Sequence, residues 1–163
     1  MQFRHLYRLT AVPFVLALWL AGAPAVYADE PTQGVGTDTI SLSPVVERLA
    51  DGNVFIDYTF TENFAGLVSG TRVGSGELVI HADGTLNTQN SGVFTGTIAG
   101  RSGTAVMEFW GTGTFASATG NLTGGHGTGG LDGVHLVAKV SGSATGPTSL
   151  AGTETFKVTF SAA

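Results

Sequence analysis

The sequence predicts an all-β fold, a small closed antiparallel β-barrel that follows an export signal. Apolar residues recur at every second position, Asp-Gly turn signals separate these runs, and 24 of the residues after position 28 are glycine. Several short strands at regular spacing, seven to nine by these signals, without a β-α-β unit indicate a barrel or a sandwich. Glycine within the strand segments permits the bends that roll a sheet into a small cylinder, and it favours the barrel.

Residues 1–28 have the three-part layout of a cleavable secretory signal peptide. Arg4 and Arg8 make the start positive, an apolar run follows over residues 11–21, and small residues precede a cleavage position after Ala28. The alternative is an uncleaved anchor helix, which would need roughly twenty apolar residues, about twice the length of this run. We therefore expect cleavage after Ala28 and a secreted or periplasmic protein.

The chain after position 28 is acidic and contains no cysteine. Five Lys and Arg remain there against all twelve Asp and Glu, a net charge of −7. Such a surface repels phosphate backbones, so we expect no nucleic-acid partner. No later stretch could form a membrane helix, and no membrane contact is expected after signal cleavage. Because the chain has no thiols, it cannot form disulfides, iron–sulfur clusters or thiolate zinc sites.

The barrel domain is expected to begin at residue 40, and its first half carries clear strand and turn signals. Residues 29–39 are expected to be a flexible lead-in, and residues 40–163 to form a single barrel domain. Pro44 indicates an edge strand or a bulge in the first strand, and Asp51-Gly52 suits a tight hairpin. The next run alternates strictly, with one face formed by Val54, Ile56, Tyr58 and Phe60.

The second half repeats these signals. Asp83-Gly84 separates the runs 77–81 and 85–87, and Gly100-Arg101-Ser102-Gly103 marks a turn before residue 104. In the last run Phe156, Val158 and Phe160 alternate with polar residues. This alternation is typical of antiparallel strands with one face buried and one face in water.

Three ordered stretches carry a resemblance to a known family. They run from Phe64 to Thr85, from Phe94 to Thr104 and from Gly127 to His135. Together they resemble the bacterial domain-of-unknown-function family 3224, which belongs to the allene oxide cyclase-like barrel superfamily. This chain has Asp132 where that family usually has Ala, and Val134 where Leu is usual. The resemblance implies an eight-stranded antiparallel barrel, and it brings no established activity or catalytic residues.

The stretch Gly125–Gly130 fits the Gly-x-Gly-x-x-Gly pattern of dinucleotide sites. Such a site needs a helix after the glycines to receive the pyrophosphate. Here the flanks, residues 115–122 and 131–140, have the pattern of strands. We therefore predict a rim loop or a bulged corner and no cofactor.

The three histidines after the signal, His81, His126 and His135, lack the close spacing of metal ligands, and no metal site is predicted. Their convergence at one rim of the barrel stays open.

Glu108 is the best candidate for acid–base chemistry, because both faces of its strand are largely apolar. One interpretation points Glu108 into the interior beside Trp110, where burial would raise the pKa of its carboxyl. The other turns Glu108 to water while Met107 and Phe109 pack inward, and strand alternation favours this second interpretation. Asp57 is a weaker candidate, and Glu77 is another.

Two functions remain open. The leading one is a non-enzymatic barrel that binds a small apolar molecule or has a structural or stress-related role outside the cytoplasm. The alternative is a cyclase or isomerase acting on a small apolar substrate. The expected ligand-binding residues are Tyr58, Arg72, Glu108 and Trp110, with Glu108 as the catalytic candidate.

A serine hydrolase lacks support because no Gly-x-Ser-x-Gly elbow precedes a helix. A transmembrane barrel fits poorly because aromatic girdles are missing. The ligand's identity, a packed or open interior and homo-oligomer formation stay open.

Overall fold

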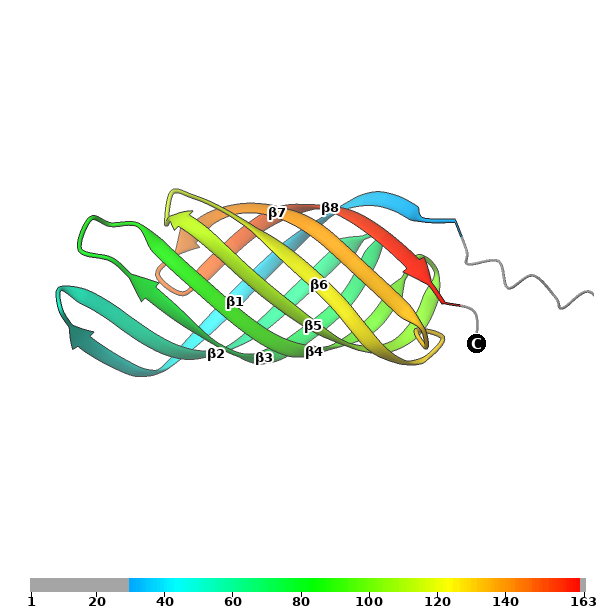
Figure 1. Cartoon of the computed structure of the whole chain (residues 1–163), viewed down its shortest axis with the longest axis horizontal. Helices are drawn as coiled ribbons and strands as arrows, with labels where there is room; N and C mark the ends of the chain where they lie inside the picture. The colour runs from blue at the N-terminus through cyan, green and yellow to red at the C-terminus, as the bar shows by residue number, and fades with distance from the viewer. Residues whose placement is uncertain (1–29, 162–163) are drawn as a thin grey trace, which may run out of the picture.

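The computed structural model describes residues 30–161, which form a closed ring of eight antiparallel strands (Figure 1). The strands are β1 (Thr32–Ala50), β2 (Asn53–Gly66), β3 (Val68–Ile80), β4 (Leu86–Ile98), β5 (Arg101–Thr114), β6 (Ser117–Gly129), β7 (Val134–Gly146) and β8 (Ser149–Phe160). Each strand pairs with its neighbours in the chain, and β1 pairs with β8 to close the ring. The all-β antiparallel prediction is confirmed. The described residues include no helix long and apolar enough to cross a membrane. The expected signal peptide, residues 1–28, lies outside them.

The start of β1 corrects the expected domain boundary. β1 begins at Thr32, and its residues up to Ser41 pair with β8. The expectation of a flexible lead-in is therefore wrong from Thr32 onward. The error has a simple cause: Gly34 and Gly36 stand where the alternating pattern would need apolar residues, so the segment has no visible period of two.

The turns divide the barrel into two ends. Four hairpins, with turns at residues 51–52, 82–84, 115–116 and 147–148, lie at one end, which we call the open end (Figure 1). The other end, here the packed end, holds the remaining turns and the start of β1. Asp51 and Gly52 both have positive φ, at 52° and 78°, as a tight hairpin of this sequence requires. The predicted Asp-Gly turns are confirmed.

Three local features depart from a regular ladder of strands. Pro44 adjoins a register shift in β1, which confirms the predicted bulge. The glycine stretch near His126 is a bulged corner of β6, opposite a register shift between Thr104 and Val106. The turn before β5 falls at Ala99-Gly100, and β5 already begins at Arg101, inside the motif that was expected to form the turn.

The packed end is filled by apolar side chains. Its core consists of Phe64, Val68, Phe94, Ile98, Ala105, Met107, Leu122, Leu131, Val134, Leu136, Ala138, Phe156, Val158 and Phe160. Inward-facing glycines make room for the larger rings: a Cβ atom at Gly120 would lie 2.5 Å from the ring of Phe109. The glycine-rich strands therefore let aromatic side chains occupy a narrow interior.

Candidate functional site

Four charged side chains lie buried in the interior between the two ends. Asp38 of β1, Glu62 of β2, Arg72 of β3 and Glu154 of β8 are 4%, 4%, 1% and 2% exposed. Charged residues are almost never buried so fully unless they are paired. We call these four residues the charged layer. Strand alternation positions Glu62, because it continues the inward face of Tyr58 and Phe60.

The charged layer contains one close ion pair. Nε of Arg72 lies 2.6 Å from Oε2 of Glu62. The guanidinium of Arg72 also stacks over the ring of Phe60, 4.7 Å from its centroid. Oxygen atoms of the three carboxyls, those of Asp38, Glu62 and Glu154, all lie within 4.8 Å of one another. Three carboxyls thus share one guanidinium.

Burial changes the proton affinity of this layer. Desolvation, with the nearby carboxyls of Asp38 and Glu62 adding to it, raises the pKa of Glu154 to about 9. Desolvation also raises the pKa of Glu62 to about 7, although the charge of Arg72 opposes the shift. The pKa of Arg72 is lowered by desolvation, which the pairing with Glu62 partly offsets. Near neutral pH the layer therefore retains protons.

A cavity of about 100 Å³ lies above the charged layer at the open end. Its wall is mainly apolar and includes Ile40, Leu42, Leu78, Leu86, Phe109 and Phe115. Among the residues that the structure describes, Asp38 is the one charged side chain in this wall. Asp38 therefore connects the cavity to the other buried carboxyls.

One side of the cavity carries a chain of hydrogen bonds. Nδ2 of Asn90 donates to the hydroxyl of Tyr58 at 3.1 Å, and the hydroxyls of Tyr58 and Thr88 lie 2.8 Å apart. Thr88 donates in turn to the backbone carbonyl of Glu77 at 3.1 Å. Since Thr88 uses its proton there, Tyr58 donates to Thr88. Oδ1 of Asn90 is buried without a hydrogen-bond partner.

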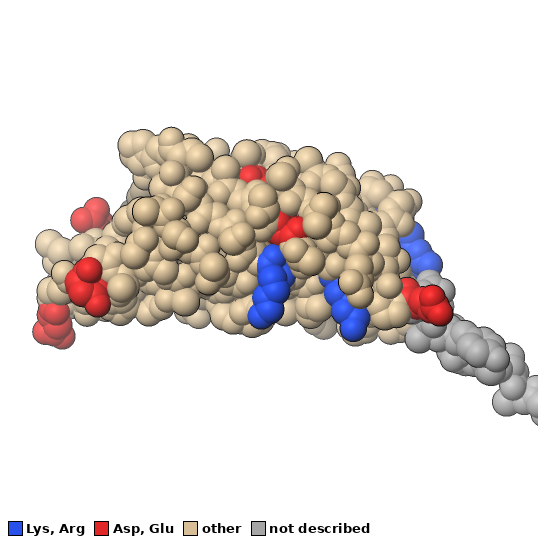
Figure 2. All heavy atoms as spheres, turned by 90° about the horizontal axis from the view of Figure 1, so that it is seen from above, with Lys and Arg blue, Asp and Glu red and all other residues tan. Residues whose placement is uncertain are grey.

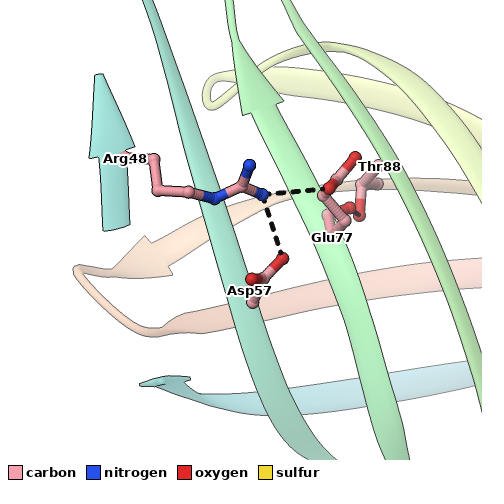
Figure 3. Close-up of polar contacts among 4 residues, drawn as sticks. All are labelled: Arg48, Asp57, Glu77 and Thr88. Atoms are coloured by element: carbon pink, nitrogen blue, oxygen red, sulfur yellow. Dashed lines mark hydrogen bonds and ion pairs between the residues drawn. The ribbon is translucent and has the colours of Figure 1, made fainter. Parts of the chain in front are cut away.

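The outer surface of the open end is acidic. Nη2 of Arg48 lies 3.6 Å from Asp57 and 3.5 Å from Glu77, and all three side chains are substantially exposed (Figure 3). Such a surface ion pair stabilises a fold by less than about 1 kcal/mol. Further carboxylates at this end belong to Glu47, Asp51 and Asp83. On the face shown in Figure 2, no Lys or Arg stands among the acidic side chains at this end. We call the carboxylates of Glu47, Asp51, Asp57, Glu77 and Asp83 the acidic rim.

The structure separates the four residues expected to bind ligand. Tyr58 and Arg72 point into the interior, and Tyr58 lines the cavity. Glu108 and Trp110 point outward, and Trp110 is 49% exposed. The interpretation that aimed Glu108 inward is therefore wrong, and the alternative with Met107 packed inside is confirmed. Whether any of the four contacts a ligand stays a prediction.

Sequence reasoning missed the three buried carboxyls. Glu62 and Glu154 stand at inward positions of their strands, in step with the apolar residues beside them. Extending the alternation of Tyr58 and Phe60 by one step would have found Glu62. No alternating pattern marked Asp38, because residues 29–39 were expected to form a flexible lead-in and not a strand.

Metal binding fits this site poorly. Among residues 30–161, Asp38, Glu62 and Glu154 form the one group with the spacing of metal ligands, and hard cations prefer such oxygens. The guanidinium of Arg72, however, already supplies the positive charge beside Glu62. The histidines lie elsewhere: His81 is at the open end, while His126 and His135 lie toward the packed end.

No family model and no curated protein matches the sequence. Among solved structures, the chain is similar to a protein of unknown function from the DUF3224 family of Shewanella oneidensis. The TM-score is 0.67 at 19% sequence identity, over 82% of this chain and 100% of the other. The likeness shows a common fold and agrees with the resemblance in the sequence motifs.

Proposed function

We propose that this protein is exported and binds a small, largely apolar molecule in the cavity at the open end. The observation that carries the proposal is the cavity itself, with its apolar wall, a hydrogen-bonded side at Tyr58 and a carboxyl floor at Asp38. Binding pockets typically combine apolar walls with a few placed polar groups. The proposed export rests on the signal-like residues 1–28.

The cavity volume sets the size of the ligand. An apolar cavity of about 150 Å³ accommodates the six carbons of benzene, so about 100 Å³ suits a group of roughly four to five carbon atoms. Burying about five carbons contributes about 4 kcal/mol. That free energy corresponds to a Kd of about 1 mM, which polar contacts would lower.

Filling the cavity tests the proposal. Ala118 lines it, whereas Ala116 lies in the neighbouring turn outside it. We expect Ala118→Phe to abolish the chemical-shift changes that isopentanol causes at Tyr58 and Leu86 in NMR titrations, and Ala116→Phe to preserve them. Equal responses in both variants would overturn the proposal. Native mass spectrometry of the exported protein would then identify a natural ligand.

A cyclase or isomerase is a second candidate. It is favoured by one observation: Asp38 lines the cavity beside buried carboxyls that retain protons, and such groups serve as general acids and bases. Cyclopentanone in heavy water provides a test. An acid–base site would exchange its α-hydrogens for deuterium faster than buffer does, and Asp38→Asn would remove the acceleration while Glu108→Gln would not. Exchange at the buffer rate would exclude this candidate.

A further inference from the structure

The cavity wall contains two buried groups that accept hydrogen bonds, and one of them lacks a partner. The first is Oδ1 of Asn90, which can only accept hydrogen bonds. The second is the carboxyl of Asp38, which is hydrogen-bonded to the carboxyls of Glu62 and Glu154 below it. The neighbouring hydroxyls of Tyr58 and Thr88 already donate along their own chain. An unpaired buried acceptor costs roughly 1–3 kcal/mol. A ligand that relieves this cost must carry hydrogen-bond donors.

The charge balance of the interior favours a donor that is also positive. If all four groups of the charged layer were ionised, three carboxylates would face the single guanidinium of Arg72. Buried charges are stable only when they are compensated. In the free protein bound protons provide that compensation, since burial raises the pKa of Glu154 and Glu62. A cationic group beside Asp38 would likewise compensate the negative charge of the carboxylates.

The acidic rim points to the same kind of ligand. Among residues 30–161, the open end holds five carboxylates and the single guanidinium of Arg48; the carboxylates are those of Glu47, Asp51, Asp57, Glu77 and Asp83. A surface with one sign of charge around an entrance attracts ions of the opposite sign and repels others. The rim would therefore attract cations to the open end, where the cavity lies, and repel carboxylates.

We propose that the cavity selects a small apolar amine, with its ammonium group at Asp38 and its hydrocarbon part against Leu78 and Leu86. This inference rests on the proposed ligand binding and specifies the ligand's class. An ammonium offers three hydrogen-bond donors and no acceptor, which suits the carboxylate of Asp38 and the unpaired oxygen of Asn90. Its hydrocarbon part, at about five carbons, matches the cavity.

The proposal has a further consequence for protons. A positive charge beside Asp38 makes proton loss from Glu154 and Glu62 easier, because a nearby opposite charge favours a carboxylate. Binding of the amine should therefore release up to about one proton near pH 8. Isothermal titration calorimetry in two buffers with different ionisation enthalpies measures this release. A binding event without proton release would contradict the proposed position of the ammonium group.

Three probes with one carbon skeleton test the selectivity: isopentylamine, isopentanol and isovalerate. We expect the amine to bind at least about tenfold tighter than the alcohol, a difference of about 1.4 kcal/mol, and isovalerate not to bind. Added salt should weaken the amine more than the alcohol, because salt screens the acidic rim. Alcohol binding as tight as amine binding would overturn the inference.

Asp38→Asn isolates the carboxyl. It should reduce the affinity for isopentylamine at least about tenfold and leave that for isopentanol nearly unchanged. Asp132→Asn, an exposed carboxylate at the packed end, is the matched control and should change neither. The proton-release measurement on the unaltered protein decides the question if Asp38→Asn does not fold.

The outcomes separate the inference from the proposed function. If none of the probes binds, or if Ala118→Phe leaves binding intact, the cavity is not the binding site and both proposals fail. If isopentanol binds in the cavity as tightly as isopentylamine, ligand binding stands and the preference for amines is wrong.

Discussion

Oδ1 of Asp38 occupies the space that a Cβ atom at Gly152 would take. The two residues are direct partners across β1 and β8, at the seam where the ring closes. The carboxyl of Asp38 can therefore lie inside the barrel only because its partner has no side chain. This relationship makes Gly152 part of the charged layer without contributing any polar group.

Replacing Gly152 by alanine should displace the Asp38 carboxyl. We expect a loss of about 1–3 kcal/mol in the free energy of unfolding, the usual cost of overpacking an interior. Urea unfolding measures it. Gly146→Ala is the matched control in the same hairpin, since a Cβ atom there would lie 3.8 Å from its nearest neighbour. Equal stability of the two variants would show that the seam relaxes freely.

Removing the buried guanidinium should destabilise the barrel far more than removing an exposed one. Arg72→Leu leaves the carboxyl of Glu62 buried without its cation, which costs about 3–5 kcal/mol. Arg48→Leu breaks only exposed ion pairs with Asp57 and Glu77 and should cost less than about 1 kcal/mol. Chemical denaturation at pH 8 compares them. A similar loss in both would argue against a stabilising buried pair.

Stability should decrease as the pH rises. The pKa values of Glu62 and Glu154 are about 7 and about 9 in the folded protein, above the ordinary value of 4.5. Between these limits the folded state binds more protons than the unfolded state, so the free energy of unfolding falls with increasing pH. We expect melting temperatures to decline from pH 5 to pH 9 and to level off above.

A variant assigns this pH dependence to the charged layer. Glu154→Gln should flatten the decline between pH 7 and pH 9, because the amide does not titrate. The exposed carboxyl of Glu108 provides the control, and Glu108→Gln should leave the profile as it is. Parallel profiles for Glu154→Gln and the unaltered protein would place the titration elsewhere.

Phe109 should limit the size of the ligand. Its ring lines the cavity between the inward glycines Gly111 and Gly120. Phe109→Ala should enlarge the cavity, improve the binding of benzylamine relative to isopentylamine, and destabilise the fold by about 3–5 kcal/mol. NMR titrations of both amines measure the ratio. An unchanged ratio would mean that another part of the wall sets the size.

The alternating pattern predicted most of the barrel but not its most unusual residues. Val54, Ile56, Tyr58 and Phe60 identified β2 because their side chains alternate in polarity with their neighbours. The two Asp-Gly turns placed the hairpins. Ring closure was harder to see, since the first part of β1 faces the interior with glycines and with Asp38, and neither is apolar.

The candidate site was predicted only in part for a related reason. Tyr58 was found because it is apolar enough to mark an inward face, whereas Glu62 and Glu154 look like surface residues by their type. The polarity of a residue predicts whether its side chain points inward only where apolar residues are the buried ones. In the charged layer, charged residues are buried instead. Glu108 shows the opposite case: its apolar neighbours allowed an interior position, whereas strand alternation favoured the outward position that the structure has.

The seam between β1 and β8 also determines when the charged layer can form. It joins the two ends of the domain, so Asp38 and Glu154 come together only after the whole chain has been made and every other strand pair is available. Contacts between residues far apart in sequence form slowly. A nascent chain that still lacks β8 would lack the charged layer altogether, and the layer would form only after synthesis of the domain is complete.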